Sequence, residues 1–265
     1  MSDQTTTTPG DGLAMPLLGL GVWQAAEGEE TRRAVGWALE AGYRHIDTAQ
    51  AYGNERSVGE GLRAAGVPRE DVFLTTKFRP GRRDPERELE GSLRRLGVDQ
   101  VDLYLVHWPQ GGPTRAWAGM ERAARNGLAG AIGVSNFAVD DLDAVLADAT
   151  IAPVVNQVEF SPFQFRRALL DACRRRGIVL EAYSPLARGR GLAHPTIAEI
   201  ASRLRRTPAQ VMLRWAIQRG IPVIPKSVRR ERIVANAQVF DFGLGDDDLR
   251  ALDALDRTGG TDRAV

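Results

Sequence analysis

Residues 72–79 read VFLTTKFR, a short run of apolar and β-branched residues that closes on a lysine. Such a run is typical of a strand buried on both faces, and similar runs recur along the chain, each ending beside a polar side chain. They are RHIDT (44–48), DLYLVHW (102–108), AIGVSN (131–136), VVNQVEF (154–160), IVLEAYSP (178–185) and PVIPKS (222–227). Together with PLLGLGVW (16–23), these runs predict eight strands.

Amphipathic helical patterns separate these runs, at 31–42, 55–66, 85–97 and 139–149. Alternating strands and helices indicate a parallel sheet, and eight such units in 265 residues predict an α/β fold of the (β/α)8 TIM-barrel class. The alternative is a doubly wound nucleotide-binding sheet, but LGLGVWQ (18–24) lacks the third glycine of the dinucleotide fingerprint. In a barrel, the polar residues at the strand ends converge on one face.

Composition sets limits without choosing a function. A net charge of +1 argues against nucleic-acid binding as the main task, and no apolar stretch is long enough to predict a membrane span. Cys173, the single cysteine, lies in a helical pattern and is expected to be a packing residue. The first residues have neither the basic region nor the apolar core of a secretory signal. We expect a mobile segment over 1–12, one barrel domain over 13–265, and a cytoplasmic monomer.

Lysine is rare in this chain. Only two of the 35 basic residues are lysines, Lys77 and Lys226, and each follows a run that reads as a buried strand. A lysine ammonium is compact and shifts its pKa when buried, which the arginine guanidinium does not do. Both positions are therefore candidates for chemistry, and the alternative is that two lysines survive by chance in an arginine-rich composition.

Seven segments occur in an order and at a spacing that resemble the aldo-keto reductase family along nearly the whole chain. They are GYRHIDTAQAYGNERSVGEGL (42–62), VFLTTK (72–77), VDLYLVHWP (101–109), AIGVSNF (131–137), VVNQVEFSP (154–162), AYSPLARG (182–189) and IPKSVRRERIVANAQVFDF (224–242). The resemblance, which extends to the bacterial 2,5-diketo-D-gluconate reductase-like branch, implies an N-terminal capping hairpin, an extra C-terminal helix and NADPH bound across the barrel mouth. It also implies a catalytic tetrad of Asp47, Tyr52, Lys77 and His107 that reduces aldehydes and ketones to alcohols.

The chemistry of carbonyl reduction calls for the same side chains. Hydride addition leaves negative charge on oxygen, so a proton donor must stand beside it, and Tyr52 is our candidate. A nearby Lys77 ammonium is expected to lower the phenol pKa, and Asp47 to keep that ammonium charged. His107 is expected to donate to the carbonyl oxygen. Each residue has a structural alternative: Tyr52 as a packed loop residue, Asp47 as a cap and His107 as a core histidine.

Cofactor contacts follow from the resemblance. Ser135, Asn136 and Gln157 offer amide and hydroxyl groups to a nicotinamide carboxamide, and Tyr183 offers a ring for stacking. The segment after the eighth strand resembles the family's site for the adenosine 2′-phosphate, so NADPH is expected in preference to NADH. The further implied cofactor residues are Ser184, Leu186, Lys226, Ser227, Val228, Arg229, Arg232 and Asn236.

The substrate pocket is expected to be wide and polar. Trp23, Trp108 and Ala51 are candidate walls, and Arg79 stands where many relatives have a tryptophan. We therefore expect small dicarbonyls or keto-sugar acids as substrates, and no metal. His45, two residues before Asp47, is expected to lie one layer deeper and to be structural.

Two other classes of function remain as alternatives. One is an NADPH-binding regulatory or redox-sensing subunit with little turnover. The other is a barrel hydrolase that uses Asp47 or Glu159 as acid or base, although a metal-dependent hydrolase would need more histidines at the strand ends.

Overall fold

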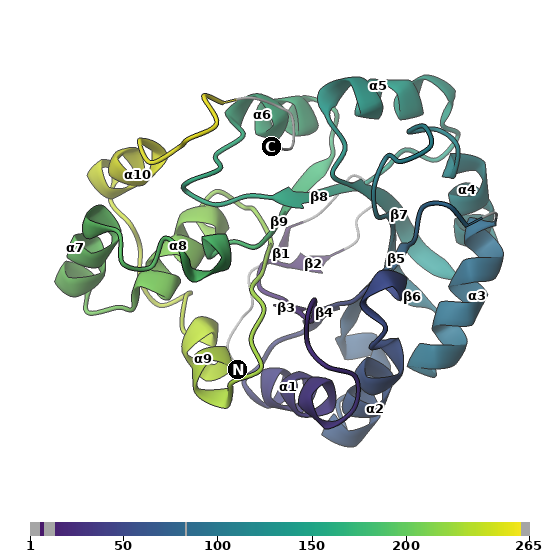
Figure 1. Cartoon of the computed structure of the whole chain (residues 1–265), viewed down its shortest axis with the longest axis horizontal. Coiled ribbons are helices and arrows are strands. Elements are labelled where there is room, and N and C mark those ends of the chain that lie inside the picture. Colours follow the sequence, from purple (N-terminus) through teal and green to yellow (C-terminus); the bar gives the residue numbers. More distant parts are fainter. Residues whose placement is uncertain (1–5, 8–13, 83, 261–265) are drawn as a thin grey trace.

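Eight parallel strands form one continuous sheet at the centre of the molecule (Figure 1). The computed structural model describes residues 6–7, 14–82 and 84–260. The strands, which neighbour one another in chain order, are β3 (Leu20–Gly21), β4 (His45–Asp47), β5 (Phe73–Phe78), β6 (Val101–Val106), β7 (Ala129–Ser135), β8 (Val155–Glu159), β9 (Val179–Tyr183) and β10 (Val223–Ile224). Each overlaps one of the eight predicted runs, with β6 and β7 beginning one and two residues earlier, so the barrel prediction is confirmed.

The first and last strands of this sheet meet and close the barrel. Leu18 pairs with Val223 and Gly21 with Lys226 in parallel bridges, and the Gly19 amide donates to the Val223 carbonyl at 2.9 Å. A Cβ on Gly21 would lie 2.8 Å from the Ile224 carbonyl oxygen, closer than ordinary van der Waals contact. The glycines of the LGLG stretch therefore allow the first and last strands to approach each other closely.

Helices surround the strands on all sides in Figure 1. They are α1 (Glu29–Glu40), α2 (Glu55–Ala65), α3 (Pro85–Leu96), α4 (Trp117–Arg125), α5 (Val139–Asp148), α6 (Arg167–Arg175), α7 (Pro195–Leu204), α8 (Pro208–Ile217), α9 (Arg230–Ala237) and α10 (Asp246–Asp253). One helix follows each of the strands β3 to β8, whereas β9 and β10 are each followed by two. The last of them, α10, is the expected extra C-terminal helix. No described helix is long and apolar enough to cross a membrane.

A short hairpin covers one end of the barrel. Strand β1 (Thr6–Thr7) pairs antiparallel with β2 (Met15–Pro16), as expected of a capping hairpin. Met15 is fully buried in a cluster that includes Phe73 and Leu103. The prediction of a mobile segment over 1–12 falls, apart from Thr6 and Thr7, outside the described residues.

Side chains at alternate strand positions point into the barrel, and their chemistry changes with depth. Near the hairpin, the inward side chains are apolar, as in the cluster of Phe73, Leu103 and Val155. Towards the carboxyl ends of the strands they become polar, with Asp47 and Lys77 both buried. The barrel therefore presents its polar groups at the mouth opposite the hairpin.

Three tryptophans lie in helices, as does the cysteine that was expected to be a packing residue. Trp117 and Trp215 are buried on α4 and α8, and Trp37 is half-buried on α1. Cys173 is fully buried on α6, and burial raises the pKa of its thiol to about 11. These residues therefore belong to the core that joins helices to strands.

Candidate active site

The Lys77 ammonium is the hub of the candidate site. Its Nζ atom donates to both oxygens of Asp47 at 2.6 and 2.7 Å, to the Thr48 carbonyl at 2.9 Å and to the Tyr52 hydroxyl at 3.3 Å. Lys77 has no exposed surface, and Asp47 has almost none. Strands β4 and β5, which are adjacent and parallel, bring the ammonium and the carboxylate together. The predicted juxtaposition of Asp47, Tyr52 and Lys77 is present.

Side-chain amides on both sides of Tyr52, the half-buried Gln50 and the buried Asn54, fix the turn that carries it. Tyr52 ends the 3-10 helix η1 (Gln50–Tyr52), and Asn54 is the N-cap residue immediately before α2. The Asn54 side chain donates to the Val22 and Ala25 carbonyls and accepts from the Thr48 hydroxyl. Gln50 donates to the Glu88 carbonyl. The Tyr52 hydroxyl is thereby held above Lys77.

His107 lies beside Tyr52 at the end of β6. The two rings meet edge to face, with 5.6 Å between their centroids. Burial, with a further effect of the Lys77 charge, lowers the pKa of His107 to about 3. The imidazole is therefore neutral at physiological pH, and a neutral imidazole retains one N–H donor.

Burial and charge act on the Tyr52 phenol in opposite directions. Burial raises its pKa above the ordinary value, while the Lys77 ammonium lowers it and the Asp47 carboxylate raises it again. The effect of Lys77 has the expected sign, but it does not outweigh burial. Burial disfavours the Lys77 ammonium, yet Asp47 and Tyr52 more than compensate and raise the pKa of Lys77. The site thus pairs a protonated phenol with a permanent cation.

A chain of hydrogen bonds links the residues expected at the nicotinamide. The Tyr183 hydroxyl donates to Asn136 Oδ1 at 2.9 Å, and Asn136 Nδ2 donates to the His107 carbonyl and to Ser135 Oγ. Ser135 Oγ donates to the Gln157 carbonyl, and Asn136 adopts a left-handed backbone conformation with φ of 65°. The polar groups of Ser135, Asn136 and Tyr183 are therefore held in fixed positions at the ends of β7, β8 and β9.

Only one end of the Gln157 side-chain amide is free for the predicted contact with a carboxamide. Its Nε2 atom donates to Asp47 Oδ2 and to Glu181 Oε2, each at 2.8 Å. Both amide hydrogens are thus used inside the barrel, and Oε1 takes no hydrogen bond from the described residues. This oxygen is an acceptor that fits the N–H of a carboxamide.

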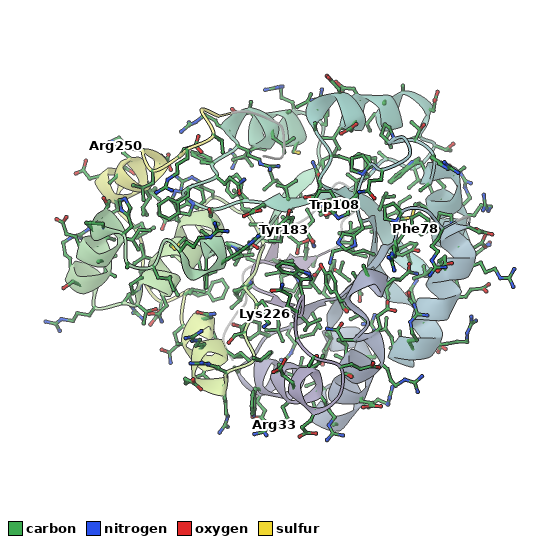
Figure 2. The ribbon with its side chains drawn as sticks, viewed as in Figure 1. Arg33, Phe78, Trp108, Tyr183, Lys226 and Arg250 are labelled. Carbon is green, nitrogen blue, oxygen red and sulfur yellow. The ribbon has the colours of Figure 1, made fainter. Side chains whose placement is uncertain are left out.

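A cavity of about 430 Å³ opens above these groups. Trp23 and Trp108 form part of its wall and are 42% and 38% exposed, which is unusual for tryptophan. Figure 2 shows Trp108, Tyr183 and Lys226 gathered around the middle of the ribbon, whereas Arg33 and Arg250 lie on its outer edge. The predicted residues that line the cavity are Trp23, Asp47, Ala51, Tyr52, His107, Trp108, Ser135, Asn136, Gln157, Tyr183, Ser184 and Lys226.

The predicted phosphate-binding segment lies beside this cavity, at the start of α9. Lys226, Arg229 and Arg232 are exposed, and none of the three forms an ion pair with a carboxylate among the described residues. Ser227 Oγ accepts from the Arg229 amide at 3.1 Å. Three cations without acidic partners fit a phosphate group. Leu186 and Val228 are half-buried and Asn236 is buried on α9.

The two lysines differ in their surroundings. Lys77 is buried, as its run predicted, but Lys226 is exposed at the barrel mouth. Lys226 follows the end of β10, and although its backbone still bridges to Gly21, its side chain is exposed to solvent. Arg79 is also exposed and does not line the cavity, so the cations of the cavity wall are Arg166, Arg188 and Lys226.

Two side chains of the site, Arg166 and Glu181, were not predicted from the sequence, and a third, Glu159, was named only for the hydrolase alternative. Arg166 is almost fully buried and lines the cavity, although it follows no strand run. Glu159 lines the cavity at the end of β8. Glu181 is fully buried inside β9, where the reading VLEAY gave no sign that the carboxyl group points into the barrel. Among the described residues, no group of three or more acidic, histidine or cysteine side chains is placed to hold a metal ion.

Comparison with known proteins places this site in a family. A family model described as "Aldo/keto reductase family" matches residues 17–257. An uncharacterized oxidoreductase of Bacillus subtilis (strain 168) is 46% identical over 95% of this chain and 93% of its own length. A glyoxal reductase of the same strain is 43% identical over 93% of this chain and 91% of its own length.

The fold agrees with a solved structure as well. A Bombyx mori aldo-keto reductase in complex with NADP is 36% identical, covers 95% of this chain and 92% of its own chain, and superposes with a TM-score of 0.87.

Proposed function

The chain belongs to the aldo/keto reductase family, and from that membership we propose that it reduces small carbonyl compounds with Tyr52 as the proton donor. The family establishes an NADP-dependent oxidoreductase that acts on carbonyl compounds. The roles of individual residues, the substrate and the similarity to the 2,5-diketo-D-gluconate reductase-like branch are our proposals. The observation that carries the mechanism is the contact of one buried ammonium with both Asp47 and the Tyr52 hydroxyl.

Each of the four side chains has one task in this proposal. Bound NADPH supplies the hydride. Tyr52 donates its hydroxyl proton to the carbonyl oxygen as negative charge develops there. The Lys77 ammonium stabilises the phenolate that remains, and Asp47 keeps the ammonium charged and in place. Neutral His107 donates one N–H to the carbonyl oxygen and fixes its orientation.

The cofactor is held by groups at two ends of the mouth. We propose that Gln157 Oε1, Ser135 and Asn136 face the carboxamide and that the Tyr183 ring stacks on the nicotinamide. Lys226, Ser227, Arg229 and Arg232 face the 2′-phosphate, which favours NADPH over NADH. Ser184 and Leu186 follow Tyr183 along the same wall, and Val228 and Asn236 lie on the adenine side.

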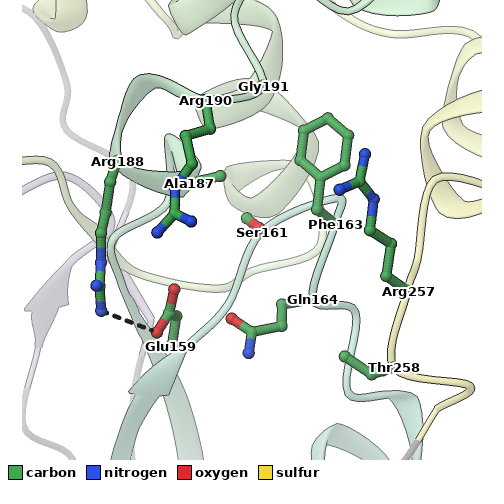
Figure 3. Close-up of a pocket in the computed structure, with 10 residues that line it drawn as sticks. All are labelled: Glu159, Ser161, Phe163, Gln164, Ala187, Arg188, Arg190, Gly191, Arg257 and Thr258. Carbon is green, nitrogen blue, oxygen red and sulfur yellow. Dashed lines mark hydrogen bonds and ion pairs between the residues drawn. The ribbon is translucent and has the colours of Figure 1, made fainter. Parts of the chain in front are cut away.

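The substrate class is proposed from the charge of the mouth. A second cavity of about 380 Å³ adjoins the first, and Glu159 and Arg188 line both. Figure 3 shows Arg190 beside the ion pair of Arg188 and Glu159, with Arg257 next to Phe163. Neither Arg190 nor Arg257 has a carboxylate partner among the described residues. These cations favour small carbonyl substrates that carry a carboxylate, such as keto-sugar acids.

Oxidation of NADPH with a panel of carbonyls tests the proposed function. The panel contains methylglyoxal, an aromatic aldehyde, a keto-sugar acid and a bulky aromatic ketone, with NADH in parallel. We expect turnover with NADPH and higher kcat/KM for the small substrates. Equal or higher kcat/KM for the bulky ketone would contradict the substrate class. Tight NADPH binding without turnover on any member would favour the regulatory alternative.

The variant Arg190→Gln tests the anionic part of the proposal. We expect a higher KM for the keto-sugar acid and an unchanged KM for methylglyoxal, because only the first substrate carries a charge. Arg33→Gln, an exposed arginine on the outer helix α1, is the matched control. Equal changes for both substrates would contradict a charge-specific role of Arg190.

A further inference from the structure

Glu181 lies beneath the candidate active site in an unusual position for a carboxyl group. It stands in the middle of β9, opposite Gln157 of β8 in the sheet register, and its side chain has no exposed surface. Glu181 Oε2 accepts from Gln157 Nε2 at 2.8 Å, whereas Oε1 has no hydrogen-bond partner in the described part of the chain. His45 Nε2 lies 3.7 Å from Oε1.

Gln157 joins this carboxyl group to the proposed catalytic groups. One nitrogen, Gln157 Nε2, donates to both Glu181 Oε2 and Asp47 Oδ2 at 2.8 Å. The two acceptor oxygens therefore lie at most twice that distance apart. Two ionised carboxylates this close in a buried site would repel each other strongly.

The charges around Glu181 can be counted. His45 of β4 lies 3.7 Å from it, the charges of Asp47 (β4) and Lys77 (β5) act on its pKa, and its own charge acts on the pKa of Tyr52 (η1), while β3 and β10 contribute no titratable side chain. The set thus contains two carboxyl groups and one ammonium, and Asp47 already accepts two bonds from that ammonium. A second carboxylate would leave an uncompensated charge in the barrel, unless a proton resides on Glu181 or on His45.

The proton belongs on Glu181. Burial and the Lys77 charge lower the pKa of His45 to about 3, against a smaller opposing effect of the Pro16 carbonyl. Burial, and then the Asp47 charge, raise the pKa of Glu181 to about 8, while Gln157 and Lys77 act in the opposite direction. His45 Nε2 lies 3.2 Å from Thr75 Oγ1, as expected for a neutral structural histidine.

We propose that Glu181 is a positioning residue of the reductase, which as a neutral acid anchors Gln157 and thereby orients Asp47 beneath Lys77 and Tyr52. The proposal rests on the proposed role of Tyr52. When Glu181 ionises, its carboxylate adds a second negative charge beside the Gln157 amide, and this charge raises the pKa of Tyr52. Tyr52 then becomes a poorer proton donor, so turnover should fall as the pH rises past about 8.

Two substitutions separate this role from simple packing. Glu181→Gln has the shape of a neutral carboxyl group and cannot ionise. We expect its kcat at pH 7 to stay within about threefold of the parent value, and its alkaline decline to disappear. Glu181→Leu leaves one amide hydrogen of Gln157 without an acceptor, so we expect a loss of kcat of roughly 10- to 100-fold with a smaller change in KM.

A control variant removes a buried carboxylate elsewhere. Glu121 on α4 is buried and accepts from the Thr150 and Ile151 amides at 2.6 and 2.9 Å, away from the barrel mouth. Glu121→Gln should keep the pH profile of the parent enzyme. An alkaline decline that persists in Glu181→Gln, or a large loss of kcat in Glu181→Gln at pH 7, would overturn the proposal.

Infrared spectroscopy of the protein without substrate gives a readout that does not depend on turnover. The parent should show the C=O stretch of a buried protonated carboxyl group at pH 7, and this band should be lost in Glu181→Gln and in the parent above about pH 8. The absence of that band in the parent at pH 7 would overturn the proposal. Full activity of Tyr52→Phe, by contrast, would overturn the assignment of Tyr52 and leave the infrared result for Glu181 standing.

Discussion

At the scale of single residues, the site depends on one cation between two acidic groups. Lys77 is in contact with the Asp47 carboxylate and the Tyr52 hydroxyl, and it has no exposed surface. Its ammonium therefore has two effects: it balances a buried carboxylate, and it favours the phenolate of Tyr52. Removal of the charge should affect both stability and turnover.

The substitution Lys77→Met tests this double effect. We expect kcat to fall by roughly 10² to 10⁴-fold, the usual contribution of a general acid. We also expect a loss of ~3–5 kcal/mol in the free energy of unfolding, because Asp47 is left as an unpaired buried charge. Steady-state kinetics and urea denaturation measure the two quantities.

The chain supplies its own control, since Lys226 is the other lysine and is exposed. Lys226→Met should raise the KM for NADPH and leave kcat and the free energy of unfolding nearly unchanged. If both lysine variants lost kcat to the same extent, the special role of Lys77 would be contradicted.

At the scale of elements, the turn between β4 and α2 determines where the phenol stands. Asn54 follows the turn, is fully buried and makes three hydrogen bonds with groups that precede it, namely the Thr48 hydroxyl and the Val22 and Ala25 carbonyls. Val22, Ala25 and Thr48 are buried as well, so loss of the Asn54 side chain leaves buried polar groups without a hydrogen-bond partner. The position of the Tyr52 hydroxyl therefore depends on a residue that does not line the substrate cavity.

The variant Asn54→Ala should lower stability by ~1–3 kcal/mol or more and also reduce kcat, because Tyr52 is no longer fixed above Lys77. The matched control is Asp84→Ala, which removes the cap of α3, where Asp84 accepts from the Glu86 amide at 3.2 Å. Asp84 does not line the cavity, so loss of this cap should cost about 1 kcal/mol and spare kcat. Thermal unfolding and kinetics of the two variants decide the matter, and a normal kcat in Asn54→Ala would refute the positioning argument.

At the scale of the whole molecule, the sequence predicts the barrel well because strand, helix and polar strand end recur in each unit. Asp47, Lys77 and His107 are visible in the sequence since each follows a recognisable apolar run. Glu181 is not, because its position depends on which face of β9 points inward, and a run that is buried on both faces carries no alternation. The burial of Arg166 and the exposure of Lys226 depend on contacts between segments distant in the sequence, and a local sequence pattern cannot predict such contacts.

The same buried carboxyl group makes a prediction for the stability of the whole barrel. The pKa of Glu181 is about 8 in the folded protein, compared with an ordinary value of 4.5. Between these values the folded state binds one proton more than the unfolded state, so this contribution to stability is fully present below pH 4.5 and is lost as the pH rises towards 8. Relative to Glu181→Gln, the parent should lose ~1.4 kcal/mol per pH unit in this range. Urea denaturation of both proteins at pH 6 and 7 measures the difference, and a constant difference would contradict a neutral Glu181.

The central claim is that Tyr52 gives up the proton, and the substitution Tyr52→Phe tests it most directly. This change removes the hydroxyl group and keeps the ring beside His107. The measurement combines NADPH binding, followed by fluorescence, with the rate of NADPH oxidation on methylglyoxal. We predict an unchanged Kd for NADPH and a fall in kcat of roughly 10²-fold or more, because only proton donation in the transition state is lost. An unchanged kcat would contradict the account.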